Sequence, residues 1–275
     1  MMTESVRKPA VAGLFYPGDP IELRNDLDRL FQKTKCPERK GIVRGIIAPH
    51  AGYMYSGFTA ACGYARVAGA TYDVVVVVAP SHREYFDNVS VYPGAAYQTP
   101  LGQIPIAEGI RDGLLQSCTH VIASEAGHLK EHAIEVHLPF LQRILPEFRL
   151  LPLVIGHQSR EISFDLGRAL GDLLRRGNAL LIASTDLSHY YPSSVANRLD
   201  AVVVGDLRRF DEEALMDDLD AGRAEACGGG PAVAVMTALR VMGATSMEVV
   251  HHCNSGDITG DTSSVVGYVA AVAYA

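Results

Sequence analysis

A run of five valines and the four residues behind it decide the fold: Val74-Val75-Val76-Val77-Val78-Ala79-Pro80-Ser81-His82. β-Branched side chains on both faces of a strand are typical of a strand that is covered on both sides. Pro80 then ends the strand, because proline lacks the N–H that a sheet needs, and the loop that follows carries His82. The stretch therefore predicts a buried strand in a layered α/β protein, with an imidazole at its carboxyl end.

Five more apolar runs are predicted as strands: Ile42–Ala48, Leu150–Ile155, Ala179–Ala183, Met247–His251 and Val265–Ala273. Helical patterns lie between them, and this alternation indicates a largely parallel or mixed sheet with helices on both faces. Residues 88–106 contain Pro-Gly and Pro-Leu-Gly turns and are predicted as a hairpin excursion. Without repeats, low-complexity segments or linkers, the chain is expected to form a single three-layer α/β/α domain over residues 1–275.

The helical segments carry their own start and stop signals. Asp19 is predicted to cap a helix that has proline at its first position and apolar residues at every third or fourth place. Ser56 is predicted to cap the next helix, and an apolar stripe over residues 162–173 is expected to end at Gly177. Two further helices are predicted over residues 193–209 and 230–242.

The composition excludes several classes of function. A net charge of −7 and a pI of about 5.8 do not favour binding to nucleic acid or an anionic membrane, because phosphates need a basic face. Residues 1–9 are polar and do not resemble a signal peptide, and no apolar stretch reaches the ~18 residues of a membrane span. Five widely spaced cysteines without a C-x-x-C pair indicate a reducing compartment, so the chain is expected in the cytoplasm.

Reactive side chains follow four of the predicted strands. His50 and His82 each come just after a strand and a proline, residues 184–189 follow a third strand, and residues 254–257 follow a fourth. Ligand sites of open α/β sheets lie beyond the carboxyl ends of the strands, so we expect these side chains to meet. Two histidines and one carboxylate with open positions form the metal-binding face of non-haem Fe(II) oxygenases, and the same ligand types suit zinc and manganese. The pattern predicts a metal site at His50 and His82 with an acidic partner.

The acidic partner and its neighbours leave alternatives open. Asp257 is predicted as a ligand, the alternative being that it caps its own turn in Asp-Ile-Thr-Gly-Asp. Asp186 and His189 share one face if their turn is helical, which suits proton transfer, or else Asp186 caps the helix near residue 193. Cys227 precedes three glycines and a helix, where it would bind an anion or have an activated thiol, or else would be a buried cysteine at a glycine turn.

Two other segments are expected near the pocket. The stretch Glu131–Pro139 holds two acids and two imidazoles, but it is not the H-E-x-x-H of zinc proteases. His132 and Glu135 are expected to contact the substrate or to support the ligands, whereas His137 is expected to be structural. Tyr55 is expected to line the pocket, with plain packing as the alternative.

Taken in order, these motifs resemble those of the Memo family, which is also called protein B of the AmmeMemoRadiSam system. The similarity covers nearly the whole chain and rests on Arg7–Pro17, Pro49–Tyr53, Pro80–His82, Glu131–Pro139, Ser184–His189, Cys227-Gly228 and Gly256–Asp261. The family is similar in fold and pocket to class III extradiol ring-cleaving dioxygenases, which hold Fe(II) with two histidines and one glutamate. The resemblance implies a fold and a type of metal site, but the family has no general activity that would supply a reaction.

The resemblance also implies roles for particular residues. His50 and His82 are implied as metal ligands, and His189 as the nearby acid/base group. Placed from the downstream Thr262–Val265, Asp257 falls where eukaryotic members have a cysteine as the third ligand, and Cys253 lies four residues earlier. Fe(II) is the ion implied, with zinc and copper as alternatives.

Three functions follow as hypotheses. The first is a metal-dependent, dioxygenase-like oxidoreductase acting on a small aromatic or related molecule, with a histidine that moves a proton. The second is a non-catalytic module that binds metal or a peptide and works with a radical-SAM protein and an AMMECR-type protein, as the system's name implies. The third is a metal-dependent hydrolase, because histidine and carboxylate side chains also hold zinc.

Overall fold

The valine run forms an inner strand of the main sheet. In the computed structural model, which describes residues 5–34 and 41–275, β3 (Val74–Pro80) pairs in parallel with β9 (Ala179–Ser184) on one side and β8 (Arg149–Ile155) on the other. Val75 and Val77 belong to one apolar core, while Val76 and Val78 belong to a second core on the opposite face. The strand is therefore covered on both sides, as its sequence predicts.

The main sheet of the described residues has nine strands in the order β10-β12-β2-β9-β3-β8-β4-β7, with β11 paired to β12. Its other strands are β2 (Val43–Ala48), β4 (Val89–Val91), β7 (Val121–Ala123), β10 (His189–Tyr191), β11 (Ser246–Asn254) and β12 (Val265–Tyr274). Strands β2, β9, β3 and β8 run in parallel, whereas β12 is antiparallel to β2 and β4 is antiparallel to β8. The prediction of a largely parallel, mixed sheet is confirmed.

The predicted hairpin over residues 88–106 is only partly right. Its second half does form a hairpin, because β5 (Ala96–Thr99) and β6 (Gly102–Pro105) are antiparallel, and β1 (Val6–Arg7) adds to them as a third strand. Its first half is β4, which pairs with β8 and extends the main sheet instead. The segment thus crosses from one sheet to the other, a long-range pairing that turn signals in the sequence do not reveal.

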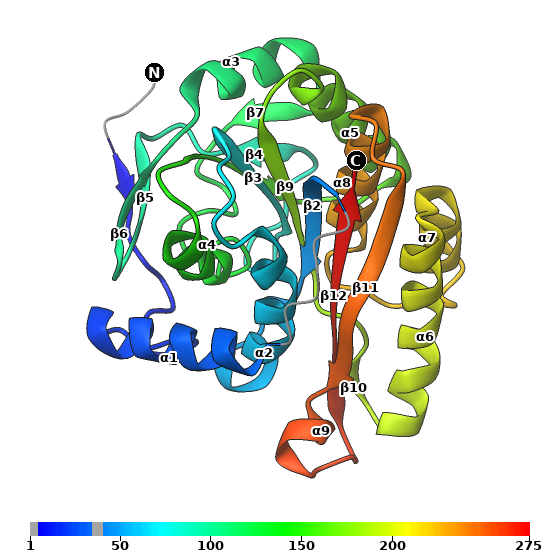
Figure 1. Cartoon of the computed structure of the whole chain (residues 1–275). Helices are drawn as coiled ribbons and strands as arrows, with labels where there is room; N and C mark the ends of the chain where they lie inside the picture. The colour runs from blue at the N-terminus through cyan, green and yellow to red at the C-terminus, as the bar shows by residue number, and fades with distance from the viewer. Residues whose placement is uncertain (1–4, 35–40) are drawn as a thin grey trace.

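The helices form a layer on each face of the main sheet (Figure 1). One layer contains α1 (Pro20–Lys33), α2 (Tyr53–Tyr64) and α4 (Leu138–Ile144), whose apolar residues join the core that contains Val75. The other contains α3 (Glu108–Ser117), α5 (Arg160–Leu174), α6 (Ser193–Arg209), α7 (Glu212–Asp220) and α8 (Gly229–Val241), which join the core of Val76. Three short segments complete the fold: η1 (Ala65–Val67), η2 (Glu135–His137) and α9 (Gly256–Thr259). This is the three-layer α/β/α arrangement that was predicted.

Helix caps agree with the sequence in one case and differ in two. Asp19 caps α1 as predicted, since its carboxylate accepts the N–H groups of residues 21 and 22. Ser56 is not a cap: α2 begins earlier, after Gly52, and the Ser56 hydroxyl donates to the carbonyl of Ala51. Gly177 does not end α5 in a left-handed conformation, because the helix stops at Leu174 and its cap residue keeps a helical backbone.

Glu135 fastens the N-terminal segment to the body of the protein. Its buried carboxylate forms an ion pair with the buried guanidinium of Arg7 and accepts the hydroxyl of Tyr16. It also accepts the backbone N–H of Ala10 at 2.7 Å and that of Val11 at 3.1 Å. Glu135 does not line the cavity, contrary to its expected place at the substrate or behind the ligands, because these partners hold it as a structural anchor.

His137 is a buried, structural imidazole, as its sequence context predicts. Its Nδ1 lies 2.7 Å from the hydroxyl of Tyr64. Burial, together with the nearby His132, lowers the pKa of His137 to about 3. The ring is therefore neutral in the native protein at neutral pH.

Titration of His137 makes a testable contribution to stability. The His137 ring takes up a proton near pH 6.5 in the unfolded chain but only near pH 3 in the native protein. The stability that comes from the neutral ring is therefore fully present above pH 6.5 and is lost as the pH falls toward 3. We expect the stability difference between wild type and His137→Gln to shrink by a few kcal/mol (~1.4 for each pH unit of the shift, as an upper bound) over that range. Urea denaturation at several pH values measures it, and a difference that is constant with pH would contradict the assignment.

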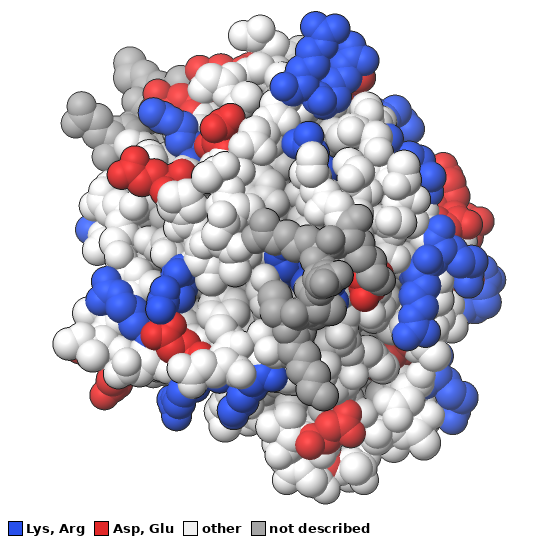
Figure 2. Space-filling view, viewed as in Figure 1, with Lys and Arg blue, Asp and Glu red and all other residues white. Residues whose placement is uncertain are grey.

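The surface that Figure 2 shows carries charges of both signs, interspersed with uncharged residues. No helix within residues 5–34 and 41–275 combines the length and apolarity needed to cross a membrane.

Candidate metal centre

Three residues of the site lie directly after the carboxyl ends of three neighbouring parallel strands. His50 follows β2, Asp186 follows β9 and His82 follows β3, and these strands are adjacent in the sheet. The backbone N–H of His50 donates to Asp186 Oδ1 at 2.8 Å, which ties the first two loops together. The rings of His50 and His82 lie 5.0 Å apart, centre to centre. The side chains that follow these strand ends therefore lie close together, as the sequence predicts.

A third imidazole, His132, completes a group with the geometry of a metal site. Its ring centre lies 4.9 Å from that of His82 and 5.4 Å from that of His50. One ring nitrogen from each of the three histidines lies within 4.8 Å of the others. Imidazole nitrogens are ligands for zinc, iron and copper, so this group is the candidate metal centre.

The hydrogen bonds of Ser184 determine which nitrogen His50 offers. The Ser184 hydroxyl has one proton, which it donates to the carbonyl of Ala133 at 2.6 Å. Ser184 Oγ must then accept from His50 Nδ1, 2.7 Å away. Burial, with His82 and His132 nearby, holds the pKa of His50 well below its usual range, so the ring is neutral. The lone pair of His50 is therefore on Nε2, as a metal ligand requires.

Glu131 supports the other two imidazoles from behind. Its buried Oε1 lies 3.1 Å from His82 Nδ1 and 3.0 Å from His132 Nδ1, the second contact being an ion-pair contact rather than a well-aligned hydrogen bond. The carboxylate also accepts the backbone N–H groups of His82, His132 and Ala133. Burial alone would raise the pKa of Glu131, but the contacts with His132 and His82 hold it well below its usual range. A carboxylate in this position orients both rings and leaves their Nε2 atoms for a metal.

Replacing the carboxylate of Glu131 tests this support. We expect Glu131→Gln to weaken metal binding by about 10- to 100-fold, the usual cost of losing a carboxylate behind metal-bound histidines. Isothermal titration calorimetry with Zn(II) measures the change. Glu84→Gln is the matched control, because Glu84 is exposed and its carboxylate also accepts a backbone N–H, that of Gly127. Equal affinities in the two variants would show that Glu131 does not support the metal.

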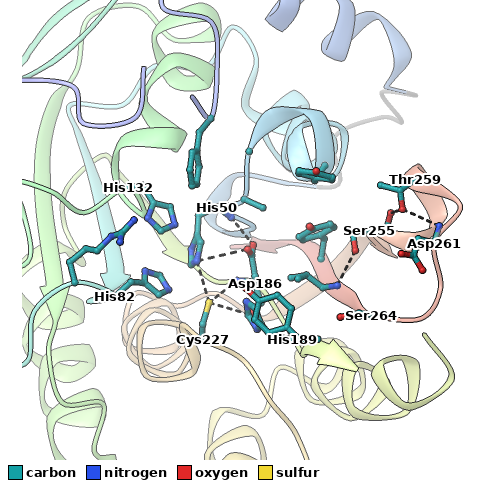
Figure 3. A pocket seen from close by; sticks show the side chains of 18 residues that line it. His50, His82, His132, Asp186, His189, Cys227, Ser255, Thr259, Asp261 and Ser264 are labelled. Atoms are coloured by element: carbon teal, nitrogen blue, oxygen red, sulfur yellow. Dashed lines mark hydrogen bonds and ion pairs between the residues drawn. The ribbon is translucent and has the colours of Figure 1, made fainter. Parts of the chain in front are cut away.

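The three histidines lie at one end of a cavity of about 800 Å³ (Figure 3). The other end carries hydroxyl groups and a carboxylate from residues 255–264. Eighteen residues line the cavity: Phe15, His50, Ala51, Gly52, Tyr55, His82, Arg83, His132, Asp186, His189, Tyr190, Cys227, Ser255, Thr259, Asp261, Ser264, Val266 and Tyr268. They include every residue named from the sequence for this pocket except Glu135 and Asp257.

Asp257 does not join the three histidines. It lies exposed in α9, and its Oδ2 accepts the backbone N–H of Asn254 at 2.9 Å. This is the turn-capping role that its sequence left open as the alternative. Cys253 is not a lining residue either, because its sulfur lies against the hydroxyl of Thr59 at 3.2 Å. The structure thus offers His132 as the third imidazole and leaves Asp257 outside the group.

Asp186 and His189 both line the cavity but do not share a helical turn. Asp186 is on the loop after β9, and it does not cap α6, whose cap residue is Pro192. Burial raises the pKa of Asp186 to about 6, against the opposing effects of the His50 N–H and His189. The carboxylate next to His189 Nδ1 is that of Glu225, at 3.8 Å, which also accepts the His189 backbone N–H. Sequence spacing missed Glu225 because it comes from a distant segment.

Cys227 lies directly beside the Nε2 atom of His50. Its Sγ is 3.2 Å from His50 Nε2 and accepts the backbone N–H of Asp186 at 3.3 Å. Since His50 Nε2 carries a lone pair, the thiol donates its proton to it. Burial raises the pKa of the Cys227 thiol, in keeping with this protonated form.

A second group of possible ligands lies on the outer surface. His120 Nε2 is 3.2 Å from Asp165 Oδ2 and 3.9 Å from Glu161 Oε1. Asp165 is already paired with Arg168, and the group is largely exposed, so its geometry is explained by surface ion pairs. The histidine cluster in the cavity is the better candidate.

The sequence of the chain matches a family of known proteins. The family model described as Memo-like protein matches residues 7–272. A MEMO1 family protein of Methanosarcina mazei is 40% identical over 270 residues, covering 97% of this chain and 98% of the relative. A MEMO1 family protein of Aquifex aeolicus is 40% identical over 265 residues, covering 96% and 97%. The crystal structure of the uncharacterized protein JW3007 from Escherichia coli K12 covers 83% of this chain and 99% of its own, at 14% identity and a TM-score of 0.49, too low a likeness to bear on function.

Proposed function

The chain belongs to the Memo family, and we propose that it is a metal-dependent, dioxygenase-like oxidoreductase that binds a divalent ion in this cavity. The single observation that carries the proposal is the group of three histidines whose ring nitrogens lie within 4.8 Å of one another. Their Nδ1 atoms face Ser184 or Glu131, so Nε2 is the nitrogen that each ring has left for a metal. The proposed ion is Fe(II), with zinc and copper as alternatives.

The residues present fit such an ion. His50 is held neutral, and Glu131 supplies a negative charge behind His82 and His132 that offsets part of the charge of the ion. The open side of the group faces the cavity, which leaves room for a substrate. When bound, a divalent ion supplies Lewis acidity and a template for substrate oxygens.

Two lining residues are proposed to move protons. Asp186 Oδ2 lies 4.0 Å from His50 Nε2, and a carboxyl with a pKa of about 6 accepts and returns a proton near neutral pH. His189 lines the same cavity, with Glu225 beside its Nδ1, so its Nε2 is the atom proposed to reach the substrate. The pair provides one acid and one base on the open side of the histidines.

The walls suit a small, flat molecule. Phe15, Tyr55 and Tyr268 present aromatic rings to the cavity. Such rings bury a planar ligand with little loss of conformational freedom. We therefore propose a small aromatic or related substrate. The roles of radical-SAM and AMMECR-type proteins, or of a peptide, stay predictions from the family resemblance.

Anaerobic loading with Fe(II), followed by oxygen-uptake measurements with catechol-like compounds, tests the proposed reaction. We expect uptake that depends on both iron and substrate in the wild type. His50→Ala, checked for folding by circular dichroism, should show none. Uptake no higher in the wild type than in His50→Ala would exclude this class of substrate.

A metal-dependent hydrolase is the second candidate, and the third histidine favours it. Three histidines with one open position hold the catalytic zinc of carbonic anhydrase, where the ion lowers the pKa of its bound water. Asp186 would then serve as the base beside that water. Metal analysis of protein purified without chelator separates the candidates, because zinc as the resident ion would favour hydrolysis and iron the oxidoreductase.

A further inference from the structure

Tyr190 has an unusual backbone conformation at a position beside the cavity. Its φ of 64° lies in the left-handed region, where the Cβ of a bulky residue comes too close to the following carbonyl oxygen. Within residues 5–34 and 41–275, Phe210 is the one other non-glycine residue with a positive φ. Strain of this kind persists only where the surrounding structure imposes it, and it clusters at functional sites.

The strain at Phe210 has a structural explanation that does not apply to Tyr190. Phe210 is the C-cap of α6, its side chain is only 3% exposed, and the guanidinium of Arg240 lies 4.7 Å from the centre of its ring. Burial of a large ring offsets the strained backbone at that position. The Tyr190 side chain is 77% exposed, so packing of its ring within the protein does little to offset the strain.

A β-bulge explains where Tyr190 directs its side chain. β10 pairs with β12 through His189 and Tyr191, and Tyr190 lies between them, where the register shifts. Neighbouring residues of a regular strand point to opposite faces of the sheet. His189 and Tyr190 instead both line the cavity, and their ring centres lie 5.7 Å apart. The bulge and the left-handed residue therefore turn the Tyr190 ring toward the cavity.

The exposed ring stands beside a group that is proposed to take part in the reaction. In Figure 3, His189 lies between the histidine end of the cavity and the end formed by residues 255–264. Three other aromatic residues line the same cavity: Phe15, Tyr55 and Tyr268. A tyrosine ring offers a flat apolar face, on which another aromatic ring stacks with little loss of side-chain freedom.

We propose that Tyr190 determines the specificity of the site for flat aromatic molecules, by stacking its ring on a substrate that His189 reaches with its imidazole. The inference rests on the proposed function and deepens it. Binding covers apolar surface of the Tyr190 ring, and this burial offsets the strain of its backbone. Because the bulge fixes the backbone in advance, little freedom is lost when the substrate binds. No covalent bond forms or breaks in this step.

Glycine and alanine variants test the strain. Both substitutions remove the ring at position 190, but only glycine adopts a left-handed backbone freely. We expect the equilibrium constant of unfolding, measured with urea, to be at least about threefold smaller for Tyr190→Gly than for Tyr190→Ala. Tyr85 is the matched site, because it is 80% exposed, has no positive φ and does not line the cavity. There the alanine variant should be the more stable one, and the same order at position 190 would overturn the inference.

Calorimetric titration of the Zn(II)-loaded protein with catechol tests the role of the ring. Tyr190→Gly keeps the backbone conformation, and with it the position of His189, but should bind catechol about three- to tenfold more weakly than the wild type. Tyr190→Phe keeps the ring and should bind like the wild type, as should Tyr85→Gly. Equal affinities in Tyr190→Gly and the wild type would show that the strain serves only to place His189, and would overturn the role of Tyr190.

Fluorescence shows whether catechol lies against residue 190. The chain has no tryptophan, so the indole of Tyr190→Trp, or of the control Tyr85→Trp, is the only one in its variant. Catechol should move the emission of Tyr190→Trp to shorter wavelength and protect it from quenching by iodide, without effect on Tyr85→Trp. Catechol binding that leaves the Tyr190→Trp emission unchanged removes only the role of Tyr190. A wild type that binds no catechol would overturn the proposed class of substrate as well.

Discussion

Replacing Arg7 by Met is expected to lower the free energy of unfolding by about 3–5 kcal/mol, the usual cost of breaking a buried ion pair. Arg7 and Glu135 are both buried, and their guanidinium and carboxylate groups form an ion pair. Methionine fills much of the same space but leaves the Glu135 carboxylate uncompensated in the interior. The effect is large because the attraction is lost while the cost of burying the remaining charge stays.

Urea denaturation at pH 7 measures this change, with Arg29→Met as the control. Arg29 also forms an ion pair, with Asp26 at 2.7 Å, but the pair lies on the surface of α1. Exposed pairs of this kind contribute ~0.5 kcal/mol or less, so the control should be nearly as stable as the wild type. Similar losses in Arg7→Met and Arg29→Met would show that Arg7 does not anchor the segment.

The same arginine connects the N-terminal segment to the candidate metal centre. Its guanidinium donates to the backbone carbonyls of His128 and Glu131, in addition to Glu135. Glu131 in turn holds His82 and His132. The Arg7 and Glu131 segments are two of the motifs that carry the family resemblance, and the structure shows that the first positions the second.

The parts of the site that the sequence predicted depend on local patterns. The valine run indicates a strand covered on both faces, and each strand end then places its next polar residue at one edge of the sheet. For this reason His50, His82 and Asp186 were expected together and lie together. This prediction required only the order of strands and polar residues, and it did not depend on the orientation of side chains or on the neighbouring loops.

The parts that were missed depend on contacts between distant segments. His132 was expected beside the pocket but not as the third imidazole, and Glu131 was given no role, because both lie on an irregular loop where no periodicity fixes the direction of a side chain. Glu225 reaches His189 from the segment after α7, more than thirty residues along the chain. Asp257 was assigned to the metal from its position in the family motif. A local contact explains the error, because its carboxylate instead accepts the backbone N–H of Asn254.

A pair of variants distinguishes these two assignments of the third ligand. We expect His132→Ala to weaken Zn(II) binding by about 100-fold or more, because it removes one of three imidazoles and also leaves Glu131 with one ring fewer to pair with. Asp257→Ala should change the affinity by less than about threefold, because its carboxylate is exposed and caps a turn beyond the cavity lining. Competition with a chromogenic chelator measures both affinities in one titration.

The comparison is informative because the two ligand sets predict opposite effects of these two substitutions on metal affinity. A set of two histidines and Asp257 requires α9 to turn inward, which would break the hydrogen bond from the Asn254 N–H and bring an exposed carboxylate to the histidines. The three-histidine set needs no such movement, since its nitrogens already lie within 4.8 Å of one another. Loss of binding in Asp257→Ala, with His132→Ala unaffected, would therefore show that α9 closes over the cavity when the ion binds, and it would restore the carboxylate to the metal centre.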